Sequence, residues 1–488
     1  MFPTQKIYLC LIGSLYAVLM AFVLIHHEAW FDEVQAWLIA RDSGLLALFT
    51  ETLRYEGHPP LWYLILMPFA KLGAPLVSSN ILAALIAGAG VFVLLRTEHV
   101  PLPVKALVPF SYFIFFQYGV VARSYALYPL FFFLLASCYR NRRERLGRFT
   151  LLLILIGNVS VHGLFIASAI FAHYLLETLI GFKKLSREER KKHLLWLGIF
   201  IANGLFLIYV LLPPDNLLFS RRVDFSFNPY KIFKLFWYTQ VSAFSGMAVV
   251  SVVVHLFSVL WLWQRRLLSL YAVTLGALCL INSVYFNRWH EGISFLNWLF
   301  LMVTGYQAEA RIQNRWSPVF EKVMASLICI ILAIQGYWTT RAVMYDVQHP
   351  YTGAAEVARF LAENNLTDRT IAGINFEGIS INGYFDHNLY ANYHEGSKPA
   401  YWDWSDRNTW YYGYPENPSK LQAKVTELLA GKPDIIIVGD KFAADRKIAS
   451  TIKDSGHYRQ VLYAKGFLFW KVKPVESNGF TVFQRVEP

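Results

Sequence analysis

The chain has 488 residues, of which 56% are hydrophobic and only 16% are charged. An average soluble domain carries about 25% charged residues, so this composition excludes an ordinary soluble enzyme. The net charge of +12 would suggest nucleic-acid binding in a soluble chain. Here the basic residues lie between apolar segments, which is typical of the cytoplasmic loops of a membrane protein. We therefore expect the lipid bilayer as a partner and no nucleic acid.

Apolar segments near the length of a bilayer crossing, about 20 residues, are confined to the first 340 residues. Segment 59–72 is apolar but short and begins with two prolines, so we expect it to lie in the membrane interface. The segments predicted to cross the membrane are 7–25, 76–95, 104–121, 125–139, 149–179 (two short crossings), 194–212, 249–263, 267–285, 293–306 and 323–338. The sequence thus predicts an α-helical multi-pass membrane protein with about 11 spans over residues 1–340.

The orientation follows from where the basic residues fall. With segment 59–72 in the interface, the predicted inner loops hold 19 basic and 7 acidic residues, whereas the outer loops hold 9 of each. Because cytoplasmic loops are enriched in Lys and Arg, this places the N-terminus inside. The first external loop, 27–75, and the region after residue 340 then lie on the extracytoplasmic face. The predicted location is the inner (cytoplasmic) membrane.

Residues 341–488 show the pattern of a soluble α/β domain, with 17 basic and 17 acidic residues. Helices are predicted at 353–363, 421–429 and 442–452, and strands at 370–374, 434–438 and 480–486. Segments 458–464 and 466–472 are expected to form a hairpin. Residues 384–414 form a long loop rich in Tyr, Trp, Asn, His and Asp. Such a loop is often functional, although packing against the membrane domain would explain it equally well.

Metal or disulfide chemistry has little support in the sequence. The four cysteines all lie in apolar segments of the first 340 residues and no Cys-x-x-Cys pair occurs, so we predict neither a zinc cluster nor a disulfide framework. No metal ligands are assigned and no cofactor is firmly implied, but the sequence leaves open an assisting divalent cation.

Acidic residues close to the membrane are scarce, and Asp32 and Glu33 lie just after the first span. A carboxylate at this interface could act as a general base that takes the proton of an acceptor hydroxyl. The alternative is the polar end of an amphipathic helix. His58 precedes two prolines that start the next helix, so it either binds substrate near the acidic pair or caps that helix.

Three arginine sites fall on the predicted outer face, where basic residues are otherwise few. Arg123 and Tyr125 follow the span at 104–121, and Arg288, His290 and Glu291 lie between two later spans. A guanidinium group matches a phosphate through its forked donors, although simple snorkelling to the interface would also place an arginine there. We predict donor-phosphate binding by Arg123 and Arg288 and substrate binding by Tyr125, His290 and Glu291. Arg221 and Arg222 add positive charge on the same face.

The order of these motifs resembles the GT-C superfamily of membrane glycosyltransferases. An Asp-Glu pair follows the first span, His-Pro-Pro-Leu starts the next helix, and Arg-x-Tyr comes after two further spans. The resemblance covers about residues 7–140 and is strongest to the bacterial branch of protein O-mannosyltransferases and the lipid A aminoarabinose transferase. It implies that Asp32 is the catalytic base and that a basic residue at the outer face, by position Arg123, binds the carrier phosphate. The Asp-x-Asp metal signature of other branches is missing, because position 34 is Val.

The expected function is therefore an inverting glycosyltransferase. It would move a sugar from a polyprenyl-phosphate-linked donor, such as an undecaprenyl phosphate, to a glycan, lipid or protein acceptor of the cell envelope. A polyprenyl-lipid transporter or flippase is one alternative. A non-catalytic membrane scaffold that binds sugar through its C-terminal domain is another.

Overall fold

The computed structural model of the chain describes residues 3–218, 228–308, 317–410 and 418–486. These residues form two compact units. The helical unit comprises Met1–Ala21, Ala83–Leu211 and Arg222–Thr340, and the tail unit comprises Phe22–Leu82, Leu212–Arg221 and Arg341–Pro488. The sequence predicted a single boundary at residue 340. The segments of the two units instead alternate along the chain, because residues 22–82 group with the C-terminal region.

Five helices of the described residues are long and apolar enough to cross a membrane. A sixth crossing is added if a bent helix pair, α12 and α13, counts as one span. The five are α1 (Pro3–Leu24), α6 (Val77–Arg96), α10 (Val161–Gly181), α11 (Arg187–Leu211) and α16 (Ser317–Gln348). The predicted number of about 11 spans stays a prediction, because several of the other apolar helices are shorter.

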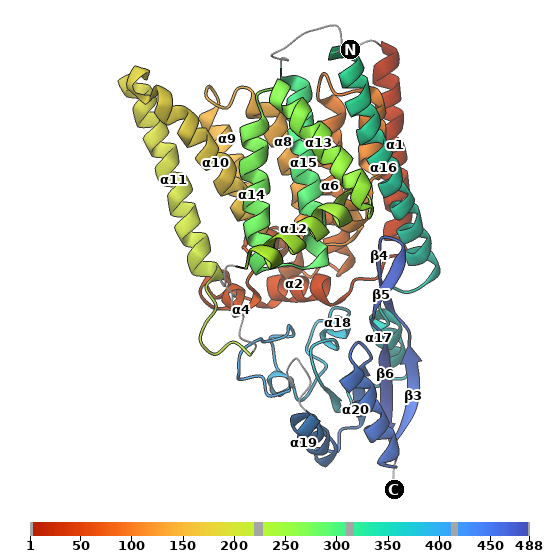
Figure 1. The fold of residues 1–488 in the computed structure, drawn as a ribbon. Helices are drawn as coiled ribbons and strands as arrows, with labels where there is room; N and C mark the ends of the chain where they lie inside the picture. The colour runs from red at the N-terminus through yellow and green to blue at the C-terminus, as the bar shows by residue number, and fades with distance from the viewer. Residues whose placement is uncertain (1–2, 219–227, 309–316, 411–417, 487–488) are drawn as a thin grey trace. The chain divides into compact units, whose positions relative to one another are not determined.

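The remaining helices of the helical unit pack around one another. In this unit α10 lies against both α9 and α14 (Figure 1). The further helices are α8 (Leu127–Tyr139), α9 (Leu146–Gly157), α12 (Pro229–Phe244), α13 (Ala248–Gln264), α14 (Leu268–Val284) and α15 (Glu291–Gln307). The predicted break within 149–179 occurs between α9 and α10, where the side chain of Ser160 caps α10 by accepting from the Gly163 amide at 3.3 Å.

Two sequence predictions need correction here. Segment 104–121 is not one continuous helix, because it divides into α7 (Leu102–Leu107), a short 3-10 turn and the π-helix η3 (Phe113–Val120). The break falls at Ser111, whose backbone is extended two residues after Pro109. The second correction is α12, which lies where only a loop was expected. Asn228 caps it and Pro229 occupies its first turn, a helix-start signal that the sequence did contain.

The two longest helices of the first loop belong to the tail unit. They are α2 (Phe31–Asp42) and α5 (Leu61–Lys71), and they pack against each other. Helix α5 has only 11 residues, a length of about 17 Å. It is therefore much shorter than the bilayer core of about 30 Å, and the interfacial position of segment 59–72 stays a prediction.

The C-terminal part of the tail unit contains a four-stranded sheet in the order β1-β2-β6-β3. Strands β1 (Ile371–Gly373) and β2 (Ile435–Gly439) are parallel, and β6 (Phe480–Arg485) runs antiparallel to β2 and to β3 (Tyr458–Ala464). All five residues of β2 are buried, so both faces of this strand are covered. Helices α19 (Pro418–Ala430) and α20 (Ala443–Asp454) contribute to the core on one face, while α17 (Ala354–Glu363) packs against β3 and β6 (Figure 1).

The hairpin predicted between 458–464 and 466–472 is wrong. Strand β3 pairs with β6, while β4 (Phe467–Trp470) turns back at Lys471 and pairs with β5 (Lys473–Ser477). Lys471 has a φ of 58°, the left-handed conformation that a two-residue hairpin turn requires. Segment 473–477 is mainly polar, so its sequence gave no strand signal, and the apolar β6 is the better partner for β3.

Candidate functional site

Glu33 lies in a closed network of hydrogen bonds in the tail unit. Its carboxylate accepts from the Asn80 side chain at 2.8 Å, from the Trp30 amide at 3.1 Å and from His27 Nε2 at 3.3 Å. The other ring nitrogen of His27 is 2.9 Å from Asp346 Oδ2. Burial lowers the pKa of His27, but the carboxylates of Asp346 and Glu33 outweigh it and raise this pKa to about 10. The imidazolium therefore donates to both carboxylates, and Glu33 serves to fix the start of α2.

Asp32 has a different environment although it is the neighbouring residue. It is partly exposed in the first turn of α2, whereas the side chain of Glu33 is fully buried. Adjacent residues on a helix point in directions about 100° apart, which separates the two carboxylates. Of the predicted catalytic pair, Asp32 therefore has the access that a general base needs, and Glu33 is placed to orient the helix that carries it.

Side chains after the carboxyl ends of β1 and β2 surround the start of α2. The Phe31 ring is 4.8 Å from that of Phe376 and 6.3 Å from that of Trp404. The Lys441 ammonium lies 5.7 Å from the centroid of the Phe376 ring and 3.1 Å from Glu476 Oε2. Burial lowers the pKa of Lys441, but the nearby carboxyl groups, chiefly Glu476 and also Asp32, raise it. Lys441 is thus a charged neighbour of Asp32.

The predicted loop 384–414 is held against α2 by a pair of hydrogen bonds between the Gln35 side chain and the Trp402 backbone. Gln35 Oε1 accepts from the Trp402 amide at 2.8 Å, and Gln35 Nε2 donates to the Trp402 carbonyl at 2.9 Å. The same Nε2 donates to Glu56 at 2.8 Å, two residues before His58. Part of the predicted loop 384–414, residues 411–414, lies outside the described residues. The described part packs against the first loop, and His58 Nδ1 contacts the Glu56 carbonyl at 3.0 Å.

The helical unit brings together the predicted residues from distant parts of the sequence. Arg123 lies over the Tyr125 ring at 5.1 Å, and the Tyr125 ring is 5.9 Å from that of His290. Arg288 lies in the same 3-10 turn as His290, directly before α15. Glu291 is buried in the first turn of α15 and accepts from Ser242 at 2.6 Å. The predicted pair Arg221 and Arg222 lies outside the described residues.

Further polar residues adjoin this group within the apolar helices. His162 Nε2 is 3.1 Å from Asn282 Oδ1, and the rings of His162 and His290 are 4.1 Å apart. Both histidines are buried. Buried polar side chains are costly among membrane helices and mark functional positions more often than structural ones. This cluster, with Arg123 at its edge, is the candidate phosphate-binding region.

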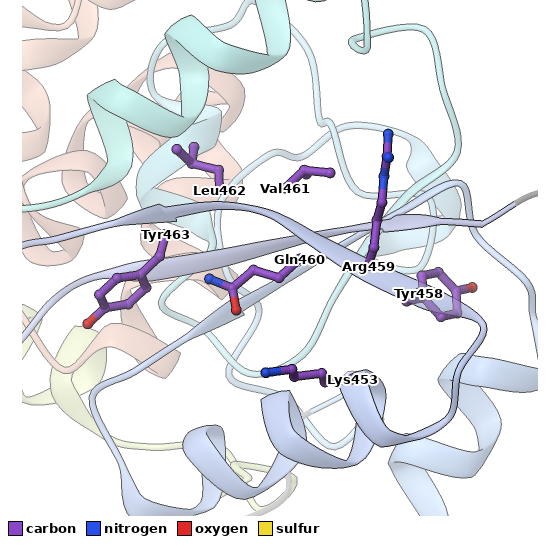
Figure 2. Close-up of a pocket in the computed structure, with 7 residues that line it drawn as sticks. All are labelled: Lys453, Tyr458, Arg459, Gln460, Val461, Leu462 and Tyr463. Atoms are coloured by element: carbon purple, nitrogen blue, oxygen red, sulfur yellow. The ribbon is translucent and has the colours of Figure 1, made fainter.

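A separate hollow of about 560 Å³ lies on the outer side of β3. Figure 2 shows its lining residues, which come from β3 and from Lys453 of α20. The pairing with β6 shifts between Gln460 and Leu462, and Val461 is the extra residue of this bulge. The hollow is open and most of its lining side chains are exposed, so it lacks the convergent polar groups of a binding site.

The described residues contain no group of three or more His, Cys, Asp or Glu side chains placed to hold a metal ion. The sequence matches no protein-family model, and a comparison with curated proteins finds no significant match.

Three residues of this region were not identified from the sequence: Gln35, Glu377 and Lys441. Glu377 and Lys441 follow the carboxyl ends of two parallel strands, where ligands of α/β sheets commonly bind. The predicted strands 370–374 and 434–438 end close to these two residues. The rule that ligands bind after the carboxyl ends of parallel strands could therefore have identified both residues as site candidates. Nothing in the sequence indicated that Gln35 would hold the backbone of Trp402.

Proposed function

We propose that the chain is an inverting glycosyltransferase that uses a polyprenyl-phosphate-linked sugar, with Asp32 as the general base. The observation that carries the proposal is the contrast between Asp32 and Glu33. One carboxylate is enclosed by three donors, while its neighbour stays partly exposed near the Lys441 ammonium. Two carboxyl groups with separate environments can take separate roles.

In the proposed reaction, Asp32 takes the proton of an acceptor hydroxyl whose oxygen attacks the anomeric carbon of the donor sugar. The new bond joins that carbon to the acceptor oxygen, and the bond to the carrier phosphate breaks with inversion. The polyprenyl phosphate leaves with the bonding electron pair, and a guanidinium group stabilises its charge. We assign that role to Arg123, with Arg288 as a second cation in the same unit.

The direct test supplies the purified full chain in detergent with undecaprenyl-phosphate-linked glucose, mannose or arabinose. A membrane extract serves as the source of acceptors. We expect release of free undecaprenyl phosphate from one of these donors, measured by mass spectrometry. The proposal fails if none is cleaved by a protein that retains its fold.

A polyprenyl-lipid flippase remains a second candidate because of one feature of the helical unit. Helices α12 and α13 pass the span criterion together but are bent by 92° at their junction, and transporters use such broken helices near their binding sites. A flippase would move the lipid-linked sugar between the leaflets of a liposome without cleaving it. Intact donor recovered from the opposite leaflet would favour this function.

Loss of the Arg123 side chain is expected to weaken donor binding. Arg123→Ala should raise the apparent dissociation constant for the lipid-linked donor about 10- to 100-fold, the loss of one charge-assisted contact. Arg123→Lys should recover only part of the affinity, because an ammonium lacks the forked donors. Arg143→Ala, at an exposed arginine of the same unit, is the control. An unchanged donor titration for Arg123→Ala would refute the assignment.

We further propose that the first loop and the C-terminal region share the extracytoplasmic face. Support comes from their direct contacts, such as the Ala400 amide donating to Asp42 at 2.9 Å, and from the shortness of α5. In intact cells, single cysteines at Glu51 and Ser397 should react with an impermeant reagent, whereas one at Arg143 should not. All three positions are exposed. Labelling of Ser397 with protection of Glu51 would contradict the shared face and, with it, the use of an external lipid donor.

A further inference from the structure

A group of partly exposed side chains surrounds the carboxyl ends of β1 and β2. We call it the aromatic rim, and it consists of Asp32, Phe376, Trp404, Lys441 and Phe442. The Phe376 ring is 5.3 Å from that of Trp404 and 6.1 Å from that of Phe442. The Lys441 ammonium is within 5.7 Å of the ring centroids of Phe376 and Phe442.

Glu377 borders the rim and has unused hydrogen-bonding capacity. It is 3% exposed, and neither carboxyl oxygen has a hydrogen-bond partner outside Glu377 itself among the described residues. The hydroxyl of Ser380, three residues later, is also buried without a partner there. Buried polar groups are normally paired, because an unpaired one costs about 1–3 kcal/mol. Two such groups only three residues apart in the sequence point to a ligand that completes them.

The protonation state of Glu377 indicates what it offers to that ligand. Burial and the nearby Asp445 carboxylate raise the pKa of Glu377 well above its usual range, and Lys441 only partly offsets this. A carboxyl group with a raised pKa keeps its proton and can donate one hydrogen bond while it accepts another. This pattern matches a hydroxyl group, which is likewise both donor and acceptor.

We propose that the aromatic rim, with Glu377 and Ser380, is the acceptor subsite and that it takes a carbohydrate. The inference rests on the proposed function, because it places the acceptor hydroxyl at Asp32. The apolar faces of sugar rings pack on the rings of Phe376, Trp404 and Phe442, while their hydroxyls pair with Glu377, Ser380 and Lys441. Such a site combines aromatic surface with a few placed polar groups, as small-molecule sites generally do.

The aromatic segment is held firmly enough to act as a platform. The Leu218 amide donates to the Trp404 carbonyl at 2.8 Å, and Gln35 fixes the backbone of Trp402 from the other side. Asp403 accepts from the Ser405 amide at 2.9 Å and from its hydroxyl at 2.7 Å. An ordered segment lowers the conformational cost of binding a ligand.

The test measures saccharide binding separately from sugar transfer. Saturation-transfer NMR is recorded on the purified full chain in detergent, with a mixture of the methyl glycosides of glucose, galactose, mannose and N-acetylglucosamine. We expect saturation of at least one glycoside. Trp404→Ala and Glu377→Leu should each weaken glycoside binding about tenfold, the equivalent of one lost contact or hydrogen bond. Glu377→Gln, which still donates and accepts, should stay within about threefold of the wild type.

A control at a residue outside the rim keeps the outcomes apart. Trp263→Ala, at a tryptophan 49% exposed on α13, should leave saturation unchanged. If undecaprenyl phosphate is released but no glycoside is saturated, the carbohydrate assignment fails and the transferase stands with a lipid or protein acceptor. If glycosides bind through Trp404 and Glu377 but no donor is cleaved, the transferase fails and the rim stands as a carbohydrate site. Equal saturation of the wild type, Trp404→Ala and Glu377→Leu also overturns the assignment.

Discussion

Asp32→Asn should abolish sugar transfer while the protein still folds and binds its donor. Asparagine preserves the size of the side chain but cannot accept the proton of the acceptor hydroxyl. Loss of a general base costs roughly 10²- to 10⁴-fold in rate. Because Asp32 is partly exposed, its replacement should leave the thermal unfolding midpoint close to that of the wild type. The measurement is the release of undecaprenyl phosphate under donor saturation, together with a donor titration.

The matched comparison for this variant is Glu33→Gln at the adjacent position. Glutamine keeps one acceptor oxygen, which can serve either the Asn80 side chain or the Trp30 amide. Part of the network therefore survives, and transfer should fall much less than in Asp32→Asn. Near wild-type turnover by Asp32→Asn would remove Asp32 from the mechanism. If Glu33→Gln instead lost all activity at an unchanged unfolding midpoint, the base would be Glu33.

Glu33→Ala should destabilise the tail unit strongly. The substitution leaves the buried His27 with one carboxylate instead of two and removes the acceptor of the Trp30 amide and of Asn80. Breaking a buried ion pair by deleting one partner costs about 3–5 kcal/mol. Asp32→Ala is the control, and it should change the free energy of unfolding by less than about 1 kcal/mol because the residue is partly exposed.

The same network predicts how stability depends on pH. The pKa of His27 is raised in the folded protein from 6.5 to about 10, because the carboxylates of Asp346 and Glu33 outweigh its burial. The folded state therefore binds a proton that the unfolded state releases above pH 6.5. The stabilisation is complete below pH 6.5 and is lost as pH rises towards 10. Glu33→Ala should shift this loss to lower pH, as measured by thermal unfolding of the purified chain. A variant that unfolds like Asp32→Ala at every pH would contradict the network.

The sequence alone determined where most helices form. A helix satisfies its backbone hydrogen bonds within one segment, so apolar length and local breaks such as the one within 149–179 suffice to predict it. The first-loop motif also identified Asp32 as a candidate. Apolar length alone wrongly predicted one continuous helix over segment 104–121, because Pro109 and the extended backbone of Ser111 divide it.

Only the tertiary structure decided which strands pair and how the two carboxylates differ. Pairing of β3 with β6 joins segments separated by the β4–β5 hairpin, and such a choice depends on non-local burial. Glu33 is distinguished from Asp32 by Asn80, which lies 47 residues away, and by His27, which is held in turn by Asp346. The high pKa of Glu377 likewise arises from its burial and from the approach of Asp445. Local sequence carries none of these contacts, because the electrostatic environment of a side chain is set by whatever the fold packs around it.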